Sequence, residues 1–324
     1  MSGLDCVVVA FRRPELTRQV LERVLACETG RVWVAVDGPR DHRDEEGVSA
    51  TRAVAESFSD PRICLDFSDE NLGLRRNVER GVDRLMGEHG RGVILEDDTV
   101  PEPTLFAFHR ALLDRYADDE RIGAIAGQWL EPWPKRGQRP PRPHPDWFGD
   151  FDHGFSPIMP SHGWATWKRA WDDYPRDLSA WPRLRDSGLL ERQLGATLGR
   201  EWTKVFGHLE HLDSYWLRFS LSLWLHNRLA VIPRKNMVHN TGVGHAASTF
   251  FTRGSYLDQF ESWPSEPFPP PYRYPPDLSV RSAAAEQSYF EFVIPFSTKR
   301  RHLKRMVLEG PLATWAGVRR RLRG

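Results

Sequence analysis

Short apolar runs alternate with helically spaced apolar residues along the first 130 residues of the chain. The apolar runs have the length of strands and lie at residues 6–11, 32–36, 63–67, 93–95 and 122–126. Stretches with apolar residues at helical spacing lie between them, at residues 14–25, 48–58, 75–86 and 103–116. This alternation predicts an α/β fold, in which a mostly parallel sheet is flanked by helices.

The rest of the chain has a different pattern. Residues 131–147 are rich in proline and arginine, which predicts an extended loop. An amphipathic helix is expected at 213–227, and a strand followed by a polar, glycine-containing loop at 231–244. Prolines crowd residues 262–276, and the tail beyond residue 299 is basic. The pattern therefore divides the chain into three regions, 1–130, 131–260 and 261–324.

The most informative stretch is the apolar run at residues 93–95, which ends in Glu96, Asp97 and Asp98. Because an unpaired buried carboxylate is costly, these acidic residues are expected where the strand leaves the sheet. Ligands of open α/β sheets bind at that edge, and carboxylates there suit Mg²⁺ or Mn²⁺ holding a phosphate. Alternation places Glu96 and Asp98 on one face and Asp97 on the other, so one face can hold the metal and the other a ribose or sugar hydroxyl. We predict Asp98 as the metal ligand, because it lies furthest out of the sheet. The alternative is a solvated acidic turn that caps the next helix.

A second candidate contact is Asp37, which follows the strand at residues 32–36 and precedes Gly38. A carboxylate at the end of a parallel strand can accept hydrogen bonds from a base or a ribose, and glycine lets a ligand approach the backbone. The same pair of residues is also common in plain turns.

A third candidate is the loop that begins at Asn71 and leads into the next helix. A loop-to-helix junction presents free N–H groups, and Arg75 and Arg76 add cationic donors, which together suit a diphosphate. We therefore select Asn71, Gly73, Arg76 and Asn77 as candidate ligands. The alternative is an asparagine cap followed by solvated arginines.

Candidates for proton transfer lie near residue 210. Glu210 and Asp213 are three positions apart and can share one helix face, so either is a candidate general base for an acceptor hydroxyl. His208 and His211 are alternatives, although an isolated histidine is more often a packed or surface residue. His245 and His239 lie in the polar loop after the last strand, and either could complete a metal shell or donate to a phosphate, although a loop histidine is more often a surface residue.

Composition indicates which cellular compartment and which binding partners to expect. The hydrophobic content of 40%, the charged content of 27% and the net charge of +1 are those of a globular protein without a basic field for nucleic acid. We find no signal peptide and no apolar run of membrane-spanning length, which predicts a cytoplasmic protein. The 13 tryptophans favour either sugar contacts or an aromatic core.

Several familiar motifs are missing from the sequence. It has no G-x-x-x-x-G-K-[ST] phosphate loop and no G-x-G-x-x-G fingerprint, which argues against P-loop NTPases and dinucleotide oxidoreductases. It also has no G-x-S-x-G elbow, the turn that carries the nucleophile of many hydrolases.

The candidate segments taken together resemble those of GT-A glycosyltransferases, of the family 2-like and N-acetylglucosaminyltransferase-I-like kind. The matching segments are Val7 to Pro14, Asp37-Gly38, Asn71-x-Gly73 with Arg76-Asn77, and Glu96-Asp97-Asp98, which is similar to the E-D-D form of the D-x-D motif. Residues 161–167 and 236–244 resemble a bacterial subgroup of sugar-transferase-like proteins. The resemblance spans about residues 5–250 and departs from family 2 in lacking a clear late Glu-Asp pair.

The resemblance implies a metal-dependent, inverting transfer of a sugar to an acceptor hydroxyl. The donor would be a UDP- or GDP-linked sugar, the acceptor a carbohydrate, a lipid-linked intermediate or a natural product, and the cofactor Mn²⁺ or Mg²⁺. Region 1–130 would bind the nucleotide sugar and the aromatic-rich region 131–260 the acceptor. Asp98 and His245 would hold the metal, and Asp213 or Glu210 would act as the base. The residues expected at the nucleotide sugar are Phe11, Arg12, Asp37, Asn71, Gly73, Arg76, Asn77, Glu96, Asp97 and Trp164.

Two other functions remain open at this point. A sugar-phosphate nucleotidyltransferase shares the parallel sheet but normally has a glycine-rich loop after the first strand, and residues 11–14 contain no glycine. A sugar-binding protein that lost catalysis would keep the same fold. The basic tail, with apolar residues among its charges, predicts contact with the inner face of an anionic membrane, and a solvated helix is the alternative.

Overall fold

A computed structural model describes most of the chain. It covers residues 3–129, 148–207 (without the side chains of 197 and 198), 214–242, 264–281 and 286, and the backbone of 133–134 and 260–261. The predicted loop at 131–147, the basic tail beyond residue 299, and Glu210, Asp213 and His245 fall outside this described part, apart from the short strand at 133–134.

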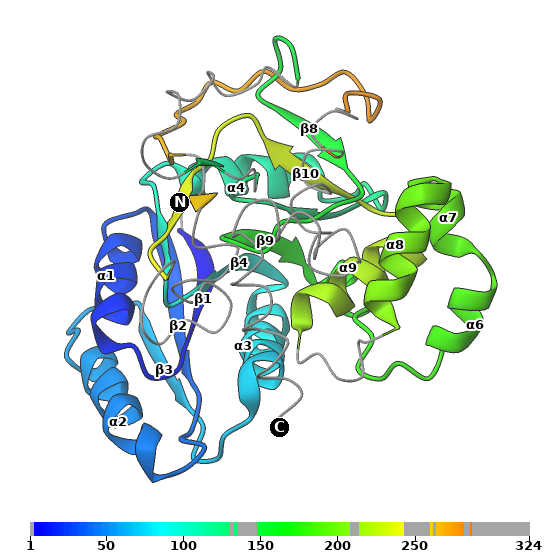
Figure 1. The fold of residues 1–324 in the computed structure, drawn as a ribbon. Helices are drawn as coiled ribbons and strands as arrows, with labels where there is room; N and C mark the ends of the chain where they lie inside the picture. Colours follow the sequence, from blue (N-terminus) through cyan, green and yellow to red (C-terminus); the bar gives the residue numbers. More distant parts are fainter. Residues whose placement is uncertain are drawn as a thin grey trace.

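A twisted eight-stranded sheet forms the centre of the protein (Figure 1). Its strand order is β3-β2-β1-β4-β9-β6-β10-β8. The strands from β3 to β4 are parallel, β6 and β10 are parallel, and the remaining pairs are antiparallel. The bounds are β1 Leu4–Ala10, β2 Thr29–Val36, β3 Ile63–Phe67, β4 Arg91–Glu96, β6 Ile122–Ile125, β8 His153–Ser156, β9 Trp164–Trp167 and β10 Leu229–Pro233. The predicted α/β fold with a mostly parallel sheet is therefore confirmed.

Helices cover both faces of this sheet. In Figure 1, α1 and α2 lie on one side of β1–β3 and α3 lies on the other, while α6, α7 and α8 lie beyond α9. The bounds are α1 Pro14–Leu25, α2 His42–Glu56, α3 Gly73–His89, α4 Leu105–Arg115, α5 Lys168–Trp171, α6 Trp181–Asp186, α7 Leu189–Leu194, α8 Ala196–Phe206 and α9 Tyr215–Leu225.

The alternation of side chains along β1 builds a core on each face. Val7 and Val9 pack into a cluster with residues of α3 and α9, whereas Cys6, Val8 and Ala10 pack into a second cluster with residues of α1 and α4. The residues of β1 from Cys6 to Ala10 are at most 4% exposed, which is why this part of the strand is entirely apolar.

Most of the buried tryptophans lie in the core on the α3 side, whereas Trp167 packs in the second cluster. Trp164 and Trp171 pack against Phe219 of α9, and Trp202 packs against Trp224. The fully buried tryptophans are Trp129, Trp164, Trp171, Trp202 and Trp224. Of the two interpretations of the tryptophan content, the described residues therefore favour the aromatic core.

Two short antiparallel pairs lie outside the main sheet. β5 (Thr99–Pro101) pairs with β11 (Val238–Asn240), and β7 (Trp133–Pro134) pairs with β12 (Phe260–Glu261). The first pair is the more important one here, because it brings the loop after β10 beside the acidic residues that follow β4.

The aromatic residues of the proline-rich segment 264–281 pack against the second cluster, the one on the α1 and α4 side. Phe268 and Tyr272 contact Phe108 of α4, and Tyr274 contacts His153 of β8. Across the described residues, no helix has the length and apolar character needed to cross a membrane.

Two buried histidines should make the fold sensitive to acid. Burial lowers the pKa of His109 to about 4 and that of His153 to about 3. An unfolded histidine titrates near 6.5, so the unfolded chain takes up protons first, and stability present above that pH is lost as the pH falls toward the folded pKa.

We predict that lowering the pH from 7.5 to 5 costs about 2 kcal/mol of unfolding free energy for each of these histidines. His109→Gln keeps a donor for the carbonyl of Gly163, which the ring nitrogen Nε2 contacts at 2.8 Å, but removes the titration. Urea unfolding at both pH values should show a smaller pH dependence in this variant. The exposed His42→Gln is the control, and an equal pH dependence in wild type and His109→Gln would contradict the prediction.

Candidate functional site

The carboxyl ends of β1 and β4 lie next to each other at the centre of the sheet. β1 pairs with β2 on one side and with β4 on the other, so the strand order changes direction here. Val9 lies opposite Glu96 in the register of the two strands, and the backbone N–H of Asp97 donates to the carbonyl of Val9 at 2.9 Å. Such a switch point leaves a crevice outside the strand ends, which is where open α/β sheets bind ligands.

Arg13 bridges the two strand ends. Its guanidinium contacts both carboxylate oxygens of Asp97, one of them through Nε at 3.2 Å, and its Nη1 lies 2.9 Å from Oδ2 of Asp98. The residue directly precedes α1, whose first position is Pro14, and its carbonyl accepts a hydrogen bond from Thr17 at 2.9 Å. Arg13 is thus fixed by the strand before it and the helix after it.

The predicted alternation of the three acidic residues is wrong for Asp97 and Asp98. β4 ends at Glu96, and the next two residues form a turn, so they no longer follow the period of a strand. As a result both aspartates contact the same guanidinium, and both are nearly closed to solvent, at 3% and 8% exposure.

Electrostatics explains why Arg13 is essential to this arrangement. Burial raises the pKa of Asp97, and the ion pair with Arg13 opposes that shift and favours the ionised carboxylate. Burial by itself would lower the pKa of Arg13, but Asp97 and Asp98 outweigh it and raise that pKa. The guanidinium therefore stays charged and compensates the buried carboxylates.

One carboxylate oxygen remains available. Oδ1 of Asp98 is buried and has no hydrogen-bond partner among the described residues. The chain around it is closely packed: a Cβ atom on Gly242 would lie 2.1 Å from Oδ2 of Asp98, and the N–H of Thr241 donates to the carbonyl of Asp98 at 2.8 Å. The loop after β11 therefore needs glycine at position 242 to approach this carboxylate.

The residues fit a divalent cation only in part. The described part of the chain contains no group of three His, Cys, Asp or Glu side chains that could hold a metal. The orphaned Oδ1 of Asp98 is nevertheless the donor that a cation would use. Mg²⁺ is commonly bound by one or two carboxylates together with substrate phosphates, and that pattern fits a single aspartate oxygen.

Glu96 connects the acidic turn to α9. Its Oε1 accepts a hydrogen bond of 2.7 Å from the hydroxyl of Tyr215, the first residue of that helix. Burial, followed by the charge of Asp98, raises the pKa of Glu96 to about 7, and the Tyr215 hydroxyl opposes this rise. Ser214 caps α9 by accepting from the N–H of Leu217, which fixes the position of Tyr215.

Asp37 is a structural hub at the end of β2. Its carboxylate accepts hydrogen bonds from the backbone N–H groups of Gly38, Leu72 and Gly73 and from the side chain of Asn71. Burial raises the pKa of Asp37, and the backbone donors oppose that shift. In this structure, the predicted Asp37, Asn71 and Gly73 therefore lie together, and their contacts hold the start of α3 against the sheet.

Asn77 and Arg12 also have protein partners. The Asn77 side chain donates to the carbonyls of Ala10 and Ala35, which ties α3 to the ends of β1 and β2. Arg12 forms an ion pair with Asp44 of α2 and lies over the ring of Phe11. These predicted nucleotide contacts thus have structural roles, at the carboxyl ends of β1 and β2.

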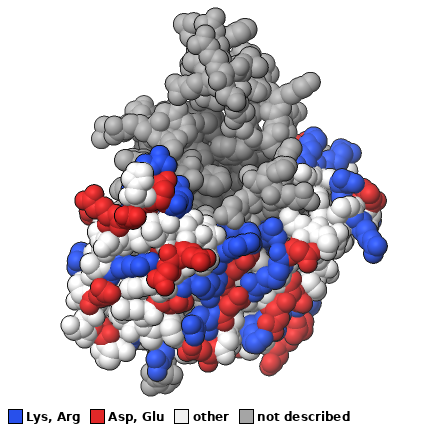
Figure 2. All heavy atoms as spheres, turned by 90° about the horizontal axis from the view of Figure 1, so that it is seen from below, with Lys and Arg blue, Asp and Glu red and all other residues white. Residues whose placement is uncertain are grey.

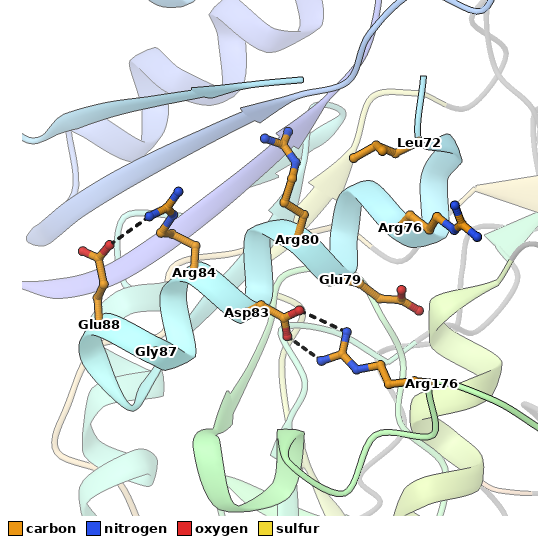
Figure 3. Close-up of a pocket in the computed structure, with 9 residues that line it drawn as sticks. All are labelled: Leu72, Arg76, Glu79, Arg80, Asp83, Arg84, Gly87, Glu88 and Arg176. Atoms are coloured by element: carbon orange, nitrogen blue, oxygen red, sulfur yellow. Dashed lines mark hydrogen bonds and ion pairs between the residues drawn. The ribbon is translucent and has the colours of Figure 1, made fainter. Parts of the chain in front are cut away.

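Arg76 lines an open pocket of about 590 Å³ along α3, and none of the three acidic residues after β4 lines it (Figure 3). Asp83 and Arg176 in this pocket form an ion pair of 2.5 Å, and Arg84 pairs with Glu88. Basic and acidic side chains also lie side by side on the face seen in Figure 2. The charges lining the pocket largely compensate one another, and we assign it no function.

Trp164 does not offer a face to a ligand. Its side chain is 0% exposed and lies among Trp171, Tyr215 and Phe219. The predicted stacking on a sugar is therefore replaced by a role in the core, because β9 lies in the middle of the sheet under α9.

Two residues of the site, Arg13 and Tyr215, are not among the candidates that the sequence pattern predicts. Both contact the acidic residues, and only Arg13 had a signal, namely its position directly after the first strand. Gly242 lies in the polar, glycine-containing loop that the sequence singles out, and the close backbone approach expected of that loop is made to Asp98. The predicted residues Glu210, Asp213 and His245 lie outside the described part of the chain.

Comparison with known proteins gives a fold-level likeness only. No protein-family model matches the chain, and no characterised protein sequence compared with it matches either. A mannosyltransferase from Pyrobaculum calidifontis, PcManGT, solved with GDP-Man and Mn²⁺, is similar over 69% of this chain and 74% of its own, with 13% identity and a TM-score of 0.36. HddC from Yersinia pseudotuberculosis is similar over 53% of this chain and 80% of its own, with 11% identity and a TM-score of 0.34. Likenesses at this level carry no conclusion about activity.

We predict that Tyr215→Phe destabilises the protein more at pH 8 than at pH 5. Ionising Glu96 costs folding free energy as the pH rises from its ordinary pKa of 4.5 to the folded value of about 7, and the Tyr215 hydroxyl offsets part of that cost. Because hydrogen bonds to charged groups are stronger, the loss should be about 2 to 3 kcal/mol at pH 8 and about 1 kcal/mol at pH 5. Urea unfolding measures both values.

Tyr272→Phe is the matched control, because the Tyr272 hydroxyl donates to a neutral carbonyl, that of Phe268, at 3.2 Å. Its loss of stability should be the same at both pH values. An equal loss at pH 5 and pH 8 for Tyr215→Phe would show that Glu96 does not respond to this hydroxyl.

Proposed function

We propose that the protein is a glycosyltransferase that uses a nucleoside-diphospho-sugar as donor, a divalent cation as cofactor and an inverting mechanism. The single observation that supports it is the acidic turn after β4, where a buried and unpartnered oxygen of Asp98 lies beside Arg13 at the switch point of the sheet. Strand ends that carry one unpaired carboxylate oxygen and a cationic neighbour suit a cation-bound diphosphate better than a neutral ligand.

Asp98 would hold the cation, with His245 as a predicted second ligand. Mn²⁺ or Mg²⁺ in that place would neutralise the charge that develops on the leaving diphosphate. Arg13 keeps the buried Asp97 compensated and keeps the Asp98 side chain in one orientation. Asp37 fixes the loop at Asn71–Gly73, so the start of α3 is presented at the same edge of the sheet.

The general base stays a prediction. Asp213 and Glu210 precede Tyr215 in the sequence, and Tyr215 is the residue whose hydroxyl contacts Glu96. The segment that carries both candidates therefore leads directly into Tyr215, the partner of Glu96. A base there would deprotonate the acceptor hydroxyl for in-line attack at the anomeric carbon.

Calorimetry with nucleotide sugars tests the proposed function. Titrations of UDP- and GDP-linked sugars, with and without Mn²⁺, should give binding that requires the cation for at least one nucleotide. Donor hydrolysis or transfer should accompany this binding. Binding without turnover would favour a sugar-binding protein, and release of pyrophosphate from a sugar phosphate and a nucleoside triphosphate would favour a nucleotidyltransferase. Absence of any cation-dependent nucleotide binding would contradict the proposal.

Asp98→Asn should weaken cation-dependent binding of the nucleotide sugar by about tenfold or more, because it keeps the shape of the side chain but removes its charge. Binding measured without the cation should change much less. Asp172→Asn is the matched control: Asp172 directly follows α5, its exposed carboxylate accepts from Lys168 at 2.6 Å, and its loss should leave nucleotide binding unchanged. Full cation-dependent affinity in Asp98→Asn would remove Asp98 from the cation site.

A further inference from the structure

Arg13 uses most of the anionic oxygens that a cation would need. Of the four carboxylate oxygens of Asp97 and Asp98, three contact its guanidinium, and only Oδ1 of Asp98 is left. Mg²⁺ and Mn²⁺ prefer about six oxygen ligands, so a single protein oxygen is a poor site for a free cation. The described part of the chain supplies no cluster of three ligating side chains that could compensate.

We propose that Arg13 keeps the empty site from holding a divalent cation, so that the cation and the diphosphate of the nucleotide enter together. This inference rests on the proposed function. Before the nucleotide arrives, the guanidinium supplies the positive charge beside the acidic turn. A diphosphate brings the missing oxygen ligands for the cation and, at the same time, anionic acceptors for the guanidinium.

The fold prevents Arg13 from leaving its place. Its side chain is only 15% exposed, and the chain on either side is held by β1 and by the first turn of α1. Asp97 contributes both of its oxygens to the pair, and it is buried, so losing Arg13 would leave a buried charge uncompensated. The ion pair is therefore a permanent part of the site and not a surface contact that a free cation displaces.

Glu96 offers at most one further oxygen, Oε2, beside this arrangement. Its Oε1 is held by the Tyr215 hydroxyl, which belongs to α9 and not to the acidic turn. A free cation approaching the turn thus meets one unpaired aspartate oxygen, a guanidinium and a glutamate with one of its two oxygens bonded to a hydroxyl. A cation that carries a diphosphate meets the same groups but needs only the one oxygen.

The test measures binding of Mn²⁺ alone, by electron paramagnetic resonance of the free ion and by calorimetry, without any nucleotide. Wild type should bind Mn²⁺ at least about tenfold more weakly than it does in the presence of the nucleoside diphosphate that supports binding. Arg13→Gln removes the competing charge and frees the aspartate oxygens, so its affinity for Mn²⁺ alone should rise by about tenfold. Its affinity for the nucleoside diphosphate should fall.

Arg13→Lys covers the case in which Arg13→Gln fails to fold. A lysine ammonium is a point charge and cannot span two carboxylates as the planar guanidinium does, so Asp98 should be partly released and Mn²⁺ affinity should rise by a smaller factor. Arg91→Gln is the control, because Arg91 lies at the opposite end of β4 and pairs with Asp114 at 2.6 Å. Circular dichroism of each variant reports whether the sheet is intact.

The outcomes separate this inference from the proposed function. Tight binding of Mn²⁺ alone to wild type, or unchanged Mn²⁺ affinity in folded Arg13 variants, would overturn the role of Arg13 even if nucleotide sugars bind as proposed. If no nucleotide binds wild type but Mn²⁺ affinity still rises in Arg13→Gln, the proposed function fails, and so does the joint entry of cation and nucleotide. The blocking of free cations by Arg13 would survive that second result.

Discussion

Carboxylates can be buried at the end of β4 because a guanidinium from the end of β1 reaches them. The ion pair joins two neighbouring parallel strands at the point where the sheet changes direction, and it fixes both the turn after β4 and the start of α1. The other contacts at this edge depend on that geometry. The Asp98 carbonyl accepts from Thr241, Gly242 lies against the Asp98 carboxylate, and Glu96 is left facing α9.

Asp37 fixes the start of α3 by hydrogen bonds, as Arg13 fixes the acidic turn by ion pairs. Its carboxylate accepts hydrogen bonds from backbone N–H groups at the start of that helix, while the Asn77 side chain donates to carbonyls at the ends of β1 and β2. Polar residues that a sequence pattern assigns to a ligand can therefore be the supports of the ligand site. Here they hold the loops at the carboxyl ends of β1 and β2 in place.

Much of the fold could be predicted from local pattern, and the site only in part. An apolar run that ends in a charged residue predicts a buried strand whose charge lies where the strand leaves the sheet, because burial of an unpaired charge is costly. Asp37 and the acidic residues after β4 lie at such strand ends, as this pattern predicts. The choice between Arg12 and Arg13 could not be made in this way. It depends on the direction in which the chain turns after β1, which sends one side chain to α2 and the other to β4. The contact of Tyr215 could not be predicted, because its partner Glu96 is distant in the sequence. The sugar-stacking role predicted for Trp164 is wrong, because no local pattern shows that its strand lies beneath a helix.

The contact between Trp164 and Tyr215 gives the protein a built-in optical reporter. The two rings are stacked with centroids 6.3 Å apart, and the Tyr215 hydroxyl is bonded to Glu96, so an indole lies two contacts from the acidic turn. Fluorescence from a buried indole responds to nearby charge and to the rigidity of its surroundings. A change of charge at the acidic turn should therefore alter the emission of Trp164, one of the chain's 13 tryptophans, without an attached label.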